Sequence, residues 1–121
     1  MGKKVLLVED YDDSRLFMKI LLEQYGFEVA EAVDGLEAVE IIRQQFPDLI
    51  LMDIAMPVMD GLTATKEIRK FERGSEIPII AVTAHGKYFY ETAIEAGCND
   101  VITKPIDFNL LEPLLNQYLK H

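Results

Sequence analysis

Short apolar runs recur along the chain and predict its strands. Three runs are apolar at almost every position: Lys4–Val8, Leu49–Asp53 and residues 77–82. Unbroken runs of this kind are typical of strands that are buried on both faces, as in the middle of a parallel sheet. Residues 27–31 alternate between apolar and polar side chains, which predicts an edge strand, and Asp100–Thr103 predicts a short fifth strand.

Longer segments between these runs carry apolar residues at helical spacing. In the first segment the apolar positions are Leu16, Phe17, Ile20, Leu21 and Tyr25. Further helices are predicted over about residues 36–46, 62–71 and 88–96. Asp107 suits the N-cap of a last helix, whose inward face would comprise Leu111, Leu114, Leu115 and Tyr118. Pro113 falls inside that helix and predicts a late start or a kink.

The order of these elements predicts the fold class. Five strand signals alternate with five helix signals along the whole chain. Such alternation is typical of an α/β fold, here a doubly wound sandwich in which a parallel sheet lies between layers of helices joined by right-handed crossovers. At 121 residues the chain is long enough for one domain with its own core. We therefore expect a single domain over residues 1–121.

Composition and charge narrow the classes of partner. The chain has 12 basic and 21 acidic residues and a net charge of −9, which argues against a nucleic-acid partner because such proteins need a basic surface. The single cysteine, Cys98, cannot form an internal disulfide, and we expect it to be a buried packing residue. The apolar runs are too short for a signal peptide or a transmembrane helix. We expect a cytoplasmic protein that does not insert into a membrane.

Polar residues with complementary chemistry follow four of the predicted strands. Glu9 and Asp10 follow the first strand, Asp53 ends the third, Thr83 follows the fourth, and Lys104 follows the fifth. Because the carboxyl ends of parallel strands meet at one edge of the sheet, we expect these side chains to converge. Each of these residues alone is weak evidence for a functional site, since a lone Asp, for example, most often caps a turn or a helix. Complementary side chains after four strands are a much more specific sign of a functional site.

The chemistry of these side chains predicts a metal-dependent phosphoryl acceptor. Glu9, Asp10 and Asp53 would repel one another unless a cation lies among them. Oxygen ligands without His or Cys favour a hard ion, and Mg²⁺ fits because it keeps several of its waters. A lysine and a hydroxyl can neutralise and hydrogen-bond phosphoryl oxygens, while Asp53 acts as the nucleophile and becomes an acyl phosphate.

At these residues the chain resembles the receiver (CheY-like) domain of two-component response regulators. The matching motifs are Val8-Glu9-Asp10, Pro47 to Asp53, Met56-Pro57 with Asp60-Gly61, Pro78 to Ala84, Ala96-Gly97 and Thr103-Lys104-Pro105. Together these motifs span almost the whole chain. The resemblance implies the flavodoxin-like (βα)5 fold, with a five-stranded parallel sheet in the order 2-1-3-4-5.

The resemblance also implies partners and a role for each reactive residue. Asp53 would accept a phosphoryl group from a histidine kinase or a histidine phosphotransfer protein, and Thr83 and Lys104 would contact that group. The phosphorylated domain would then switch a downstream partner protein or relay the group to it. Such a domain is not an enzyme in the usual sense, because it catalyses only its own phosphorylation and dephosphorylation.

A magnesium site with four contributors is implied in the same way. By the resemblance, Asp10 and Asp53 would hold Mg²⁺ together with the backbone carbonyl of Ala55, and Glu9 would orient metal-bound water. Mg²⁺ is therefore the expected cofactor.

The chain departs from the common receiver pattern at several positions. Val101 stands where many receivers have a Tyr or Phe that turns inward on activation. Ala55 and His85 occupy two variable positions that flank the phosphoryl site. The loop after Thr83 is about one residue shorter than usual. Pro113 lies in the last helix and is expected to alter a face that partners of receivers often use.

Two other functions share part of this chemistry. A hydrolase of the haloacid-dehalogenase kind also uses Asp, Thr, Lys and Mg²⁺, but it needs a second acid at the position of Ala55 and usually a cap domain. A flavodoxin-type FMN carrier needs a Ser/Thr/Gly-rich phosphate loop, whereas residues 11–14 are acidic and would repel phosphate. For a receiver, the sequence leaves open whether it is a stand-alone protein or a domain of a larger chain.

Overall fold

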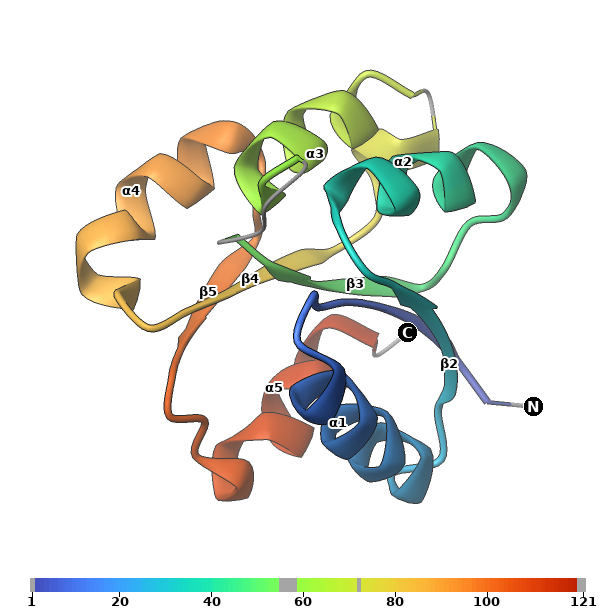
Figure 1. Cartoon of the computed structure of the whole chain (residues 1–121), viewed down its shortest axis with the longest axis vertical. Helices are drawn as coiled ribbons and strands as arrows, with labels where there is room; N and C mark the ends of the chain where they lie inside the picture. Colours follow the sequence, from blue (N-terminus) through green and yellow to red (C-terminus); the bar gives the residue numbers. More distant parts are fainter. Residues whose placement is uncertain (1, 55–58, 72, 120–121) are drawn as a thin grey trace.

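A five-stranded parallel sheet forms the middle layer of the molecule (Figure 1). The computed structural model describes residues 2–54, 59–71 and 73–119. Its elements are β1 (Lys4–Val8), α1 (Asp12–Gln24), β2 (Glu28–Ala32), α2 (Gly35–Gln44), β3 (Leu49–Asp53), α3 (Gly61–Arg69), the short 3-10 helix η1 (Arg73–Ser75), β4 (Ile79–Thr83), α4 (Gly86–Ala96), β5 (Asp100–Thr103) and α5 (Phe108–Leu119). The strand order is β2-β1-β3-β4-β5 and all neighbouring pairs are parallel. The predicted fold class and sheet order are confirmed.

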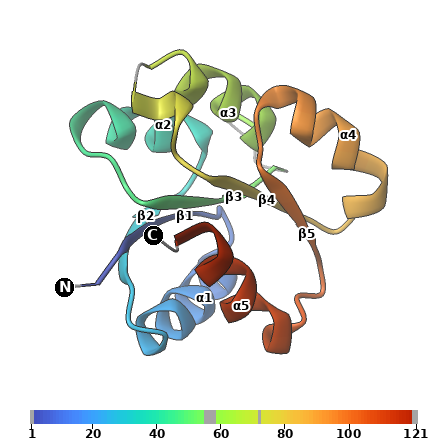
Figure 2. The same ribbon diagram turned by 180° about the vertical axis from the view of Figure 1, so that it is seen from behind.

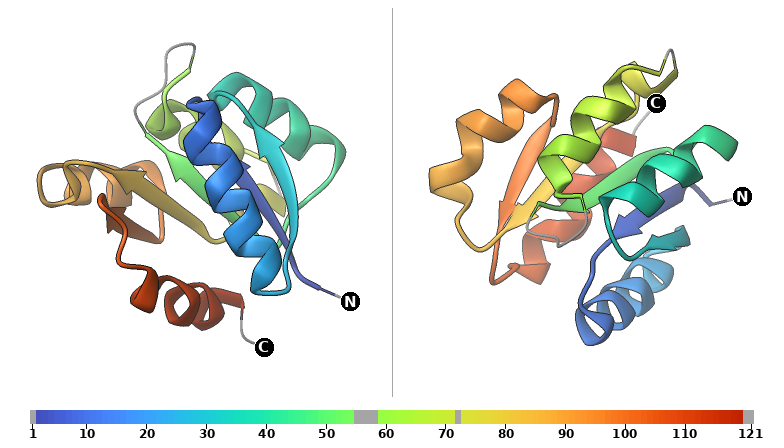
Figure 3. Two further views of the ribbon diagram at one scale, coloured as in Figure 1. Left: turned by 60° about the horizontal axis from the view of Figure 1, so that its bottom comes forward. Right: turned by 45° about the horizontal axis from the view of Figure 1, so that its top comes forward.

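The sheet divides the apolar core into two halves. Helices α2, α3 and α4 lie side by side over one face, and α1 and α5 cover the other (Figures 2 and 3). Successive strand residues point to opposite faces. Leu6 and Ile50 therefore belong to the first half of the core, while Leu7 and Leu51 belong to the second. Burial of β1, β3 and β4 on both faces explains their continuous apolar sequences.

Helix α1 buries a narrower stripe than its sequence indicates. Met18 and Leu22, four residues apart, are its buried side chains. Leu16, Phe17 and Ile20 belong to the predicted apolar spacing, yet they are exposed by 57%, 55% and 47%. A helix that packs against only one layer buries one face, so apolar residues on its outer face remain in solvent. The predicted helix is confirmed, but apolar residues at helical spacing do not by themselves show which side chains of α1 are buried.

Helix α4 begins at Gly86, two residues before the predicted start. A Cβ atom at Gly86 would collide with the side chain of Thr103 on β5, so this close approach needs a glycine. Of the three consecutive aromatic residues here, Phe89 packs against the core, whereas Tyr88 and Tyr90 are exposed by 80% and 49%. Glycine is a poor helix former, which explains why the sequence pattern placed the start too late.

Helix α5 runs without interruption across Pro113, so the predicted late start is wrong. Its N-cap is the predicted one, because the Asp107 carboxylate accepts the backbone N–H of Asn109 at 3.0 Å. Leu111 and Leu115 are buried, as expected for the inward face, and Pro113 is on the exposed side. Among the helices of the described ranges, none combines the length and apolar character required to cross a bilayer.

One arginine connects several loops at the amino-terminal edge of the sheet. The Arg69 guanidinium donates to the carbonyls of Gly74 and Ile77, both at 2.6 Å, and to the carbonyl of Gly97 at 2.9 and 2.7 Å. It also donates to Oδ1 of Asn99 at 2.8 Å, and the same oxygen accepts the first backbone N–H of β4. Arg69 thus joins α3, η1, the end of α4 and the start of β4.

Cys98 lies beside this connection and is 5% exposed. Its Sγ is 3.7 Å from Oγ1 of Thr65. Burial raises the pKa of the Cys98 thiol, so the residue is a neutral packing group at physiological pH. The predicted packing role of Cys98 is confirmed.

Candidate functional site

The five residues predicted to converge lie together at the carboxyl-terminal edge of the sheet. They line one open cleft of about 690 Å³ and are Glu9, Asp10, Asp53, Thr83 and Lys104. Asp53 is the last residue of β3 and Thr83 the last of β4, while the others directly follow β1 and β5. The cleft exists because all five strands are parallel and end on the same side.

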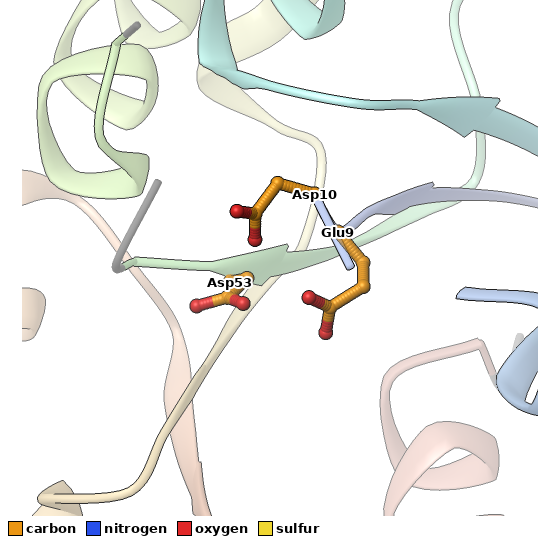
Figure 4. Close-up of side chains that lie close together, drawn as sticks. All are labelled: Glu9, Asp10 and Asp53. Atoms are coloured by element: carbon orange, nitrogen blue, oxygen red, sulfur yellow. The ribbon is translucent and has the colours of Figure 1, made fainter. Parts of the chain in front are cut away.

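Three carboxylates form the acidic centre of the cleft (Figure 4). One oxygen from each of Glu9, Asp10 and Asp53 lies within 4.8 Å of the others. Glu9 and Asp53 are buried, with 8% and 6% exposure, whereas Asp10 is exposed. An oxygen-only donor set of this kind suits a hard divalent cation, because one ion can bridge carboxylates that would otherwise repel. The described residues therefore fit Mg²⁺. Ala55, the predicted carbonyl ligand, lies outside the described residues.

Lys104 brings a positive charge next to two of the three carboxylates. Its Nζ lies 3.5 Å from Oε1 of Glu9 and 3.6 Å from Oδ2 of Asp53. The Lys104 backbone N–H donates to the carbonyl of Thr83 at 2.8 Å, which joins the ends of β4 and β5. The Lys104–Pro105 peptide bond is cis. The ammonium is thus held where it can reach oxygens attached to Asp53.

Thr83 is buried beside the cleft, with 4% exposure. Its Oγ1 accepts the backbone N–H of His85 at 3.1 Å. A hydroxyl carries one proton and two lone pairs, so accepting this bond leaves the proton for an acceptor in the cleft. The hydroxyl can therefore donate to an anionic oxygen.

Glu9 has the strongly perturbed pKa of the site. Burial raises the pKa of its carboxyl from 4.5 to about 7, and the nearby charge of Asp53 and a hydrogen bond between the two side chains act in the same direction. The backbone N–H of Tyr11, which donates to Oε2 of Glu9 at 3.2 Å, and the charge of Lys104 oppose the increase. Without a cation, the Glu9 carboxyl therefore keeps its proton to a higher pH than an ordinary glutamate does.

This raised pKa predicts a pH-dependent stability of the metal-free protein. Between about pH 4.5 and pH 7, folded Glu9 keeps a proton that the unfolded chain has released. The folded state then binds more protons, so raising the pH through this window lowers the free energy of unfolding. The full shift corresponds to about 3 kcal/mol, and solvent screening at the cleft reduces the expected loss to about 1–2 kcal/mol. Urea unfolding in EDTA at several pH values measures it.

Glu9→Gln is the control for this titration, because glutamine has no proton to lose in that range. The variant should lose the part of the pH dependence that lies between about pH 4.5 and pH 7. An equal fall in stability in the wild type and in Glu9→Gln would contradict the assignment to Glu9.

One contact of the site was not predicted from the sequence. Nη1 of Arg15, on α1, donates to the backbone carbonyl of Glu9 at 2.9 Å. The only signal for it was the spacing between Asp12 and Arg15, which favours an ion pair on a helix surface but says nothing about a loop carbonyl. The cleft is also lined by residues of α3 and α4, among them Lys66 and Phe89.

Comparisons with known proteins agree with this arrangement. The family model of the response regulator receiver domain matches residues 5–116. The chemotaxis protein CheY of Halobacterium salinarum is 42% identical over 106 residues, which cover 87% of each protein. The hybrid signal transduction histidine kinase I of Dictyostelium discoideum is 42% identical over 122 residues, which cover 94% of this chain but only 7% of that protein.

Solved structures give the same result. The receiver domain of a sensor histidine kinase from Pseudomonas aeruginosa, solved with a magnesium ion coordinated in its active-site cleft, superposes with a TM-score of 0.93. The two chains are 37% identical and each is covered completely. A chemotaxis protein CheY4 from Vibrio cholerae is 28% identical with a TM-score of 0.91, covering 98% of this chain and 100% of that one. The chain therefore belongs to the response regulator receiver domain family of two-component signal transduction.

Proposed function

We propose that this protein accepts a phosphoryl group on Asp53 in a Mg²⁺-dependent reaction and signals to a partner protein. The donor is a histidine kinase or a histidine phosphotransfer protein, and residues 1–121 form one receiver domain. The observation that carries the proposal is the juxtaposition of Asp53 with two further carboxylates within 4.8 Å and with the Lys104 ammonium at 3.6 Å. The family match over residues 5–116 supports it.

The transfer itself is a displacement at phosphorus. A carboxylate oxygen of Asp53 forms the new P–O bond while the P–N bond to the donor imidazole breaks, and the released electron pair stays on the imidazole nitrogen, which takes up a proton. Lys104 neutralises negative charge on the transferred oxygens. Thr83 donates its hydroxyl proton to one of those oxygens, a charge-assisted bond that is stronger than a neutral one.

The acidic residues would hold the metal for this step. Asp10 and Asp53 supply carboxylate oxygens, Glu9 orients a metal-bound water, and the carbonyl of Ala55 is the further ligand expected from the family. Bound Mg²⁺ supplies positive charge that offsets the repulsion between the Asp53 carboxylate and the phosphoryl oxygens. The Pseudomonas receiver domain with magnesium in its cleft supports this choice of ion.

Phosphorylation by a small donor tests the proposal directly. The protein is incubated with acetyl phosphate and Mg²⁺, and intact-mass measurement should show one phosphoryl adduct. The same incubation with EDTA should show none, because the carboxylates then remain uncompensated. An adduct that forms equally well in EDTA, or no adduct with Mg²⁺, would overturn the proposed function.

The outer face of α1 is suited to bind the helix of the partner protein that carries the donor histidine. Leu16, Phe17 and Ile20 are exposed on this face, and Phe17 lies edge-on to Phe108 of α5 at 5.5 Å between ring centroids. Phe17 and Phe108 also line an apolar pocket of about 270 Å³ that reaches Asp53. An exposed apolar surface that continues into the reactive site suits a partner that must bring its own reactive group there. We therefore include this face in the proposal as the donor-docking surface.

Ile20→Glu is expected to lower phosphotransfer from a histidine kinase at least about tenfold, because it places a charge in an apolar contact. The kinase is the member of a purified panel that transfers fastest to the wild type. Phosphorylation by acetyl phosphate should not change, because this small donor needs no docking surface. Rates of transfer from the radiolabelled kinase measure the effect.

Leu36→Glu is the matched control, because Leu36 is exposed by 44% against 47% for Ile20 but lies on α2, across the sheet. It should leave kinase transfer unchanged. Equal losses in both variants, or no loss in Ile20→Glu, would remove α1 from the docking surface.

The two alternative functions gain no observation in their favour. A small phosphate ester hydrolysed in repeated turnovers would revive the hydrolase, and a coloured purified protein would revive the flavin carrier. The β1–α1 loop carries Glu9 and Asp10, and the first turn of α1 carries Asp12 and Asp13; these four acidic residues disfavour a bound flavin phosphate.

A further inference from the structure

The side chain of Arg15 contacts the loop that carries Glu9 and Asp10. Its guanidinium makes three contacts: Nη1 donates to the Glu9 carbonyl at 2.9 Å, Nη2 to Oδ1 of Asp12 at 2.7 Å, and Nε to Oε1 of Glu31 at 3.3 Å. The Arg15 side chain is only 15% exposed, whereas Asp12 is 85% exposed. The guanidinium therefore lies between the acidic loop and β2.

The bond to the Glu9 carbonyl constrains the direction of Asp10. The peptide group that joins Glu9 to Asp10 is planar, so fixing its oxygen fixes its plane. On the other side of Glu9, its backbone N–H donates to the carbonyl of Ala32 at 3.0 Å. Both peptide groups that flank Glu9 are thus held, one by β2 and the other by Arg15, and the Asp10 side chain leaves from the second of them.

We propose that Arg15 is a positioning residue for the metal site: it holds the Glu9–Asp10 peptide so that the Asp10 carboxylate stays directed at Asp53. This inference rests on the proposed function, because it concerns the same Mg²⁺ site. In this role Arg15 acts through the Glu9 carbonyl and supplies no ligand to the ion. Its contribution is to limit the rearrangement that the loop must undergo when the carboxylates bind an ion.

A positioning role and simple charge repulsion predict opposite changes in Mg²⁺ affinity when Arg15 is removed. Arg15 is a cation beside a site that binds a cation, so through-space repulsion alone would weaken Mg²⁺ binding, and removal of Arg15 would strengthen it. If Arg15 positions the loop, its removal weakens binding, because the carboxylates lose their common direction. The sign of the change in affinity therefore separates the two effects.

The experiment measures Mg²⁺ affinity by isothermal titration calorimetry, without any phosphoryl donor. Arg15→Met keeps the aliphatic stem and removes all three contacts, and we expect its dissociation constant to rise at least about tenfold. Arg15→Lys keeps the charge but not the fork of donors, and we expect a rise of about threefold. Lys19→Met is the matched control, because Lys19 also pairs with Glu31 at 3.3 Å but lies one helical turn after Arg15 on α1. Its affinity should equal that of the wild type.

Phosphorylation supplies a second readout. The rate with acetyl phosphate should fall in Arg15→Met at limiting Mg²⁺ and return to the wild-type rate at saturating Mg²⁺, because the reactive groups themselves are intact. A rate that stays low at saturating Mg²⁺ would contradict a positioning role through the metal site.

The outcomes separate this inference from the proposed function. If the wild type does not bind Mg²⁺, the proposed function fails. If the wild type binds Mg²⁺ and Arg15→Met binds it equally well or more tightly, only the positioning role fails. Should Arg15→Met not fold, as judged by circular dichroism, then Arg15→Lys decides, and wild-type affinity in that variant overturns the inference.

Discussion

Replacing Asp53 by Asn is expected to abolish uptake of a phosphoryl group from acetyl phosphate. Asp53 ends the central strand β3 and is only 6% exposed, so its carboxylate is presented to the cleft by a rigid element. The amide of Asn has the same shape but no anionic oxygen to form the acyl phosphate. It also removes one of the clustered carboxylates that could hold the metal. Intact-mass measurement after incubation with acetyl phosphate and Mg²⁺ should show no adduct.

Asp60→Asn is the control for Asp53→Asn. Asp60 lines the same cleft, but its carboxylate caps α3 by accepting the N–H of Thr63 at 2.8 Å. Asn is as good an N-cap as Asp, so this variant should stay folded and take up one phosphoryl group. An adduct of equal stoichiometry in Asp53→Asn would show that another residue is the acceptor.

Asp10→Asn should change Mg²⁺ affinity and metal-free stability in opposite directions. Asp10 lies within 4.8 Å of two other carboxylates, so loss of its charge removes repulsion when no ion is present. The melting temperature of the metal-free protein should therefore rise by a few degrees. The same loss removes a charged ligand, and Mg²⁺ affinity should fall at least about tenfold. Thermal melts in EDTA and calorimetric titration with Mg²⁺ measure the two effects.

Asp13→Asn tests whether the effect belongs to the cluster or to the acidity of the loop. Asp13 lies nearby, in the first turn of α1, but is not a member of the group of three carboxylates. It should leave Mg²⁺ affinity almost unchanged and raise the melting temperature less than Asp10→Asn does. A lower melting temperature of metal-free Asp10→Asn, or undiminished Mg²⁺ affinity, would contradict the assignment.

The strands and the convergence at their ends could be predicted from the sequence for a simple physical reason. A strand buried on both faces is apolar at nearly every position, so the sequences of β3 and β4 are recognisable as strands before their polar last residues. Because the strands are parallel, the polar residues at their carboxyl ends lie at the same edge of the sheet. Asp53, Thr83 and Lys104 therefore line one cleft.

Other features depend on packing that local patterns do not contain. Met18 and Leu22 could not be chosen over Leu16 and Ile20 as the buried face of α1, because all four are apolar at helical spacing. The early start of α4 follows from the approach of Gly86 to β5. The raised pKa of Glu9 follows from its burial beside Asp53, which depends on tertiary structure. The contact between Arg15 and the Glu9 carbonyl is tertiary in the same sense.

The contacts of Arg69 also have a consequence for how such a domain can diversify. Its guanidinium satisfies carbonyls at the amino-terminal edge of the sheet, whereas Thr83 and the reactive cleft lie at the opposite end of the same strand, β4. Substitutions at Arg69 would leave several loop carbonyls without a partner and so act on stability. His85 lines the cleft at the other end, so changes there leave the Arg69 contacts intact. The contacts that stabilise the loops and the cleft proposed for phosphoryl transfer thus lie at opposite ends of one strand, so a protein engineer can change residues of the cleft and keep the Arg69 contacts.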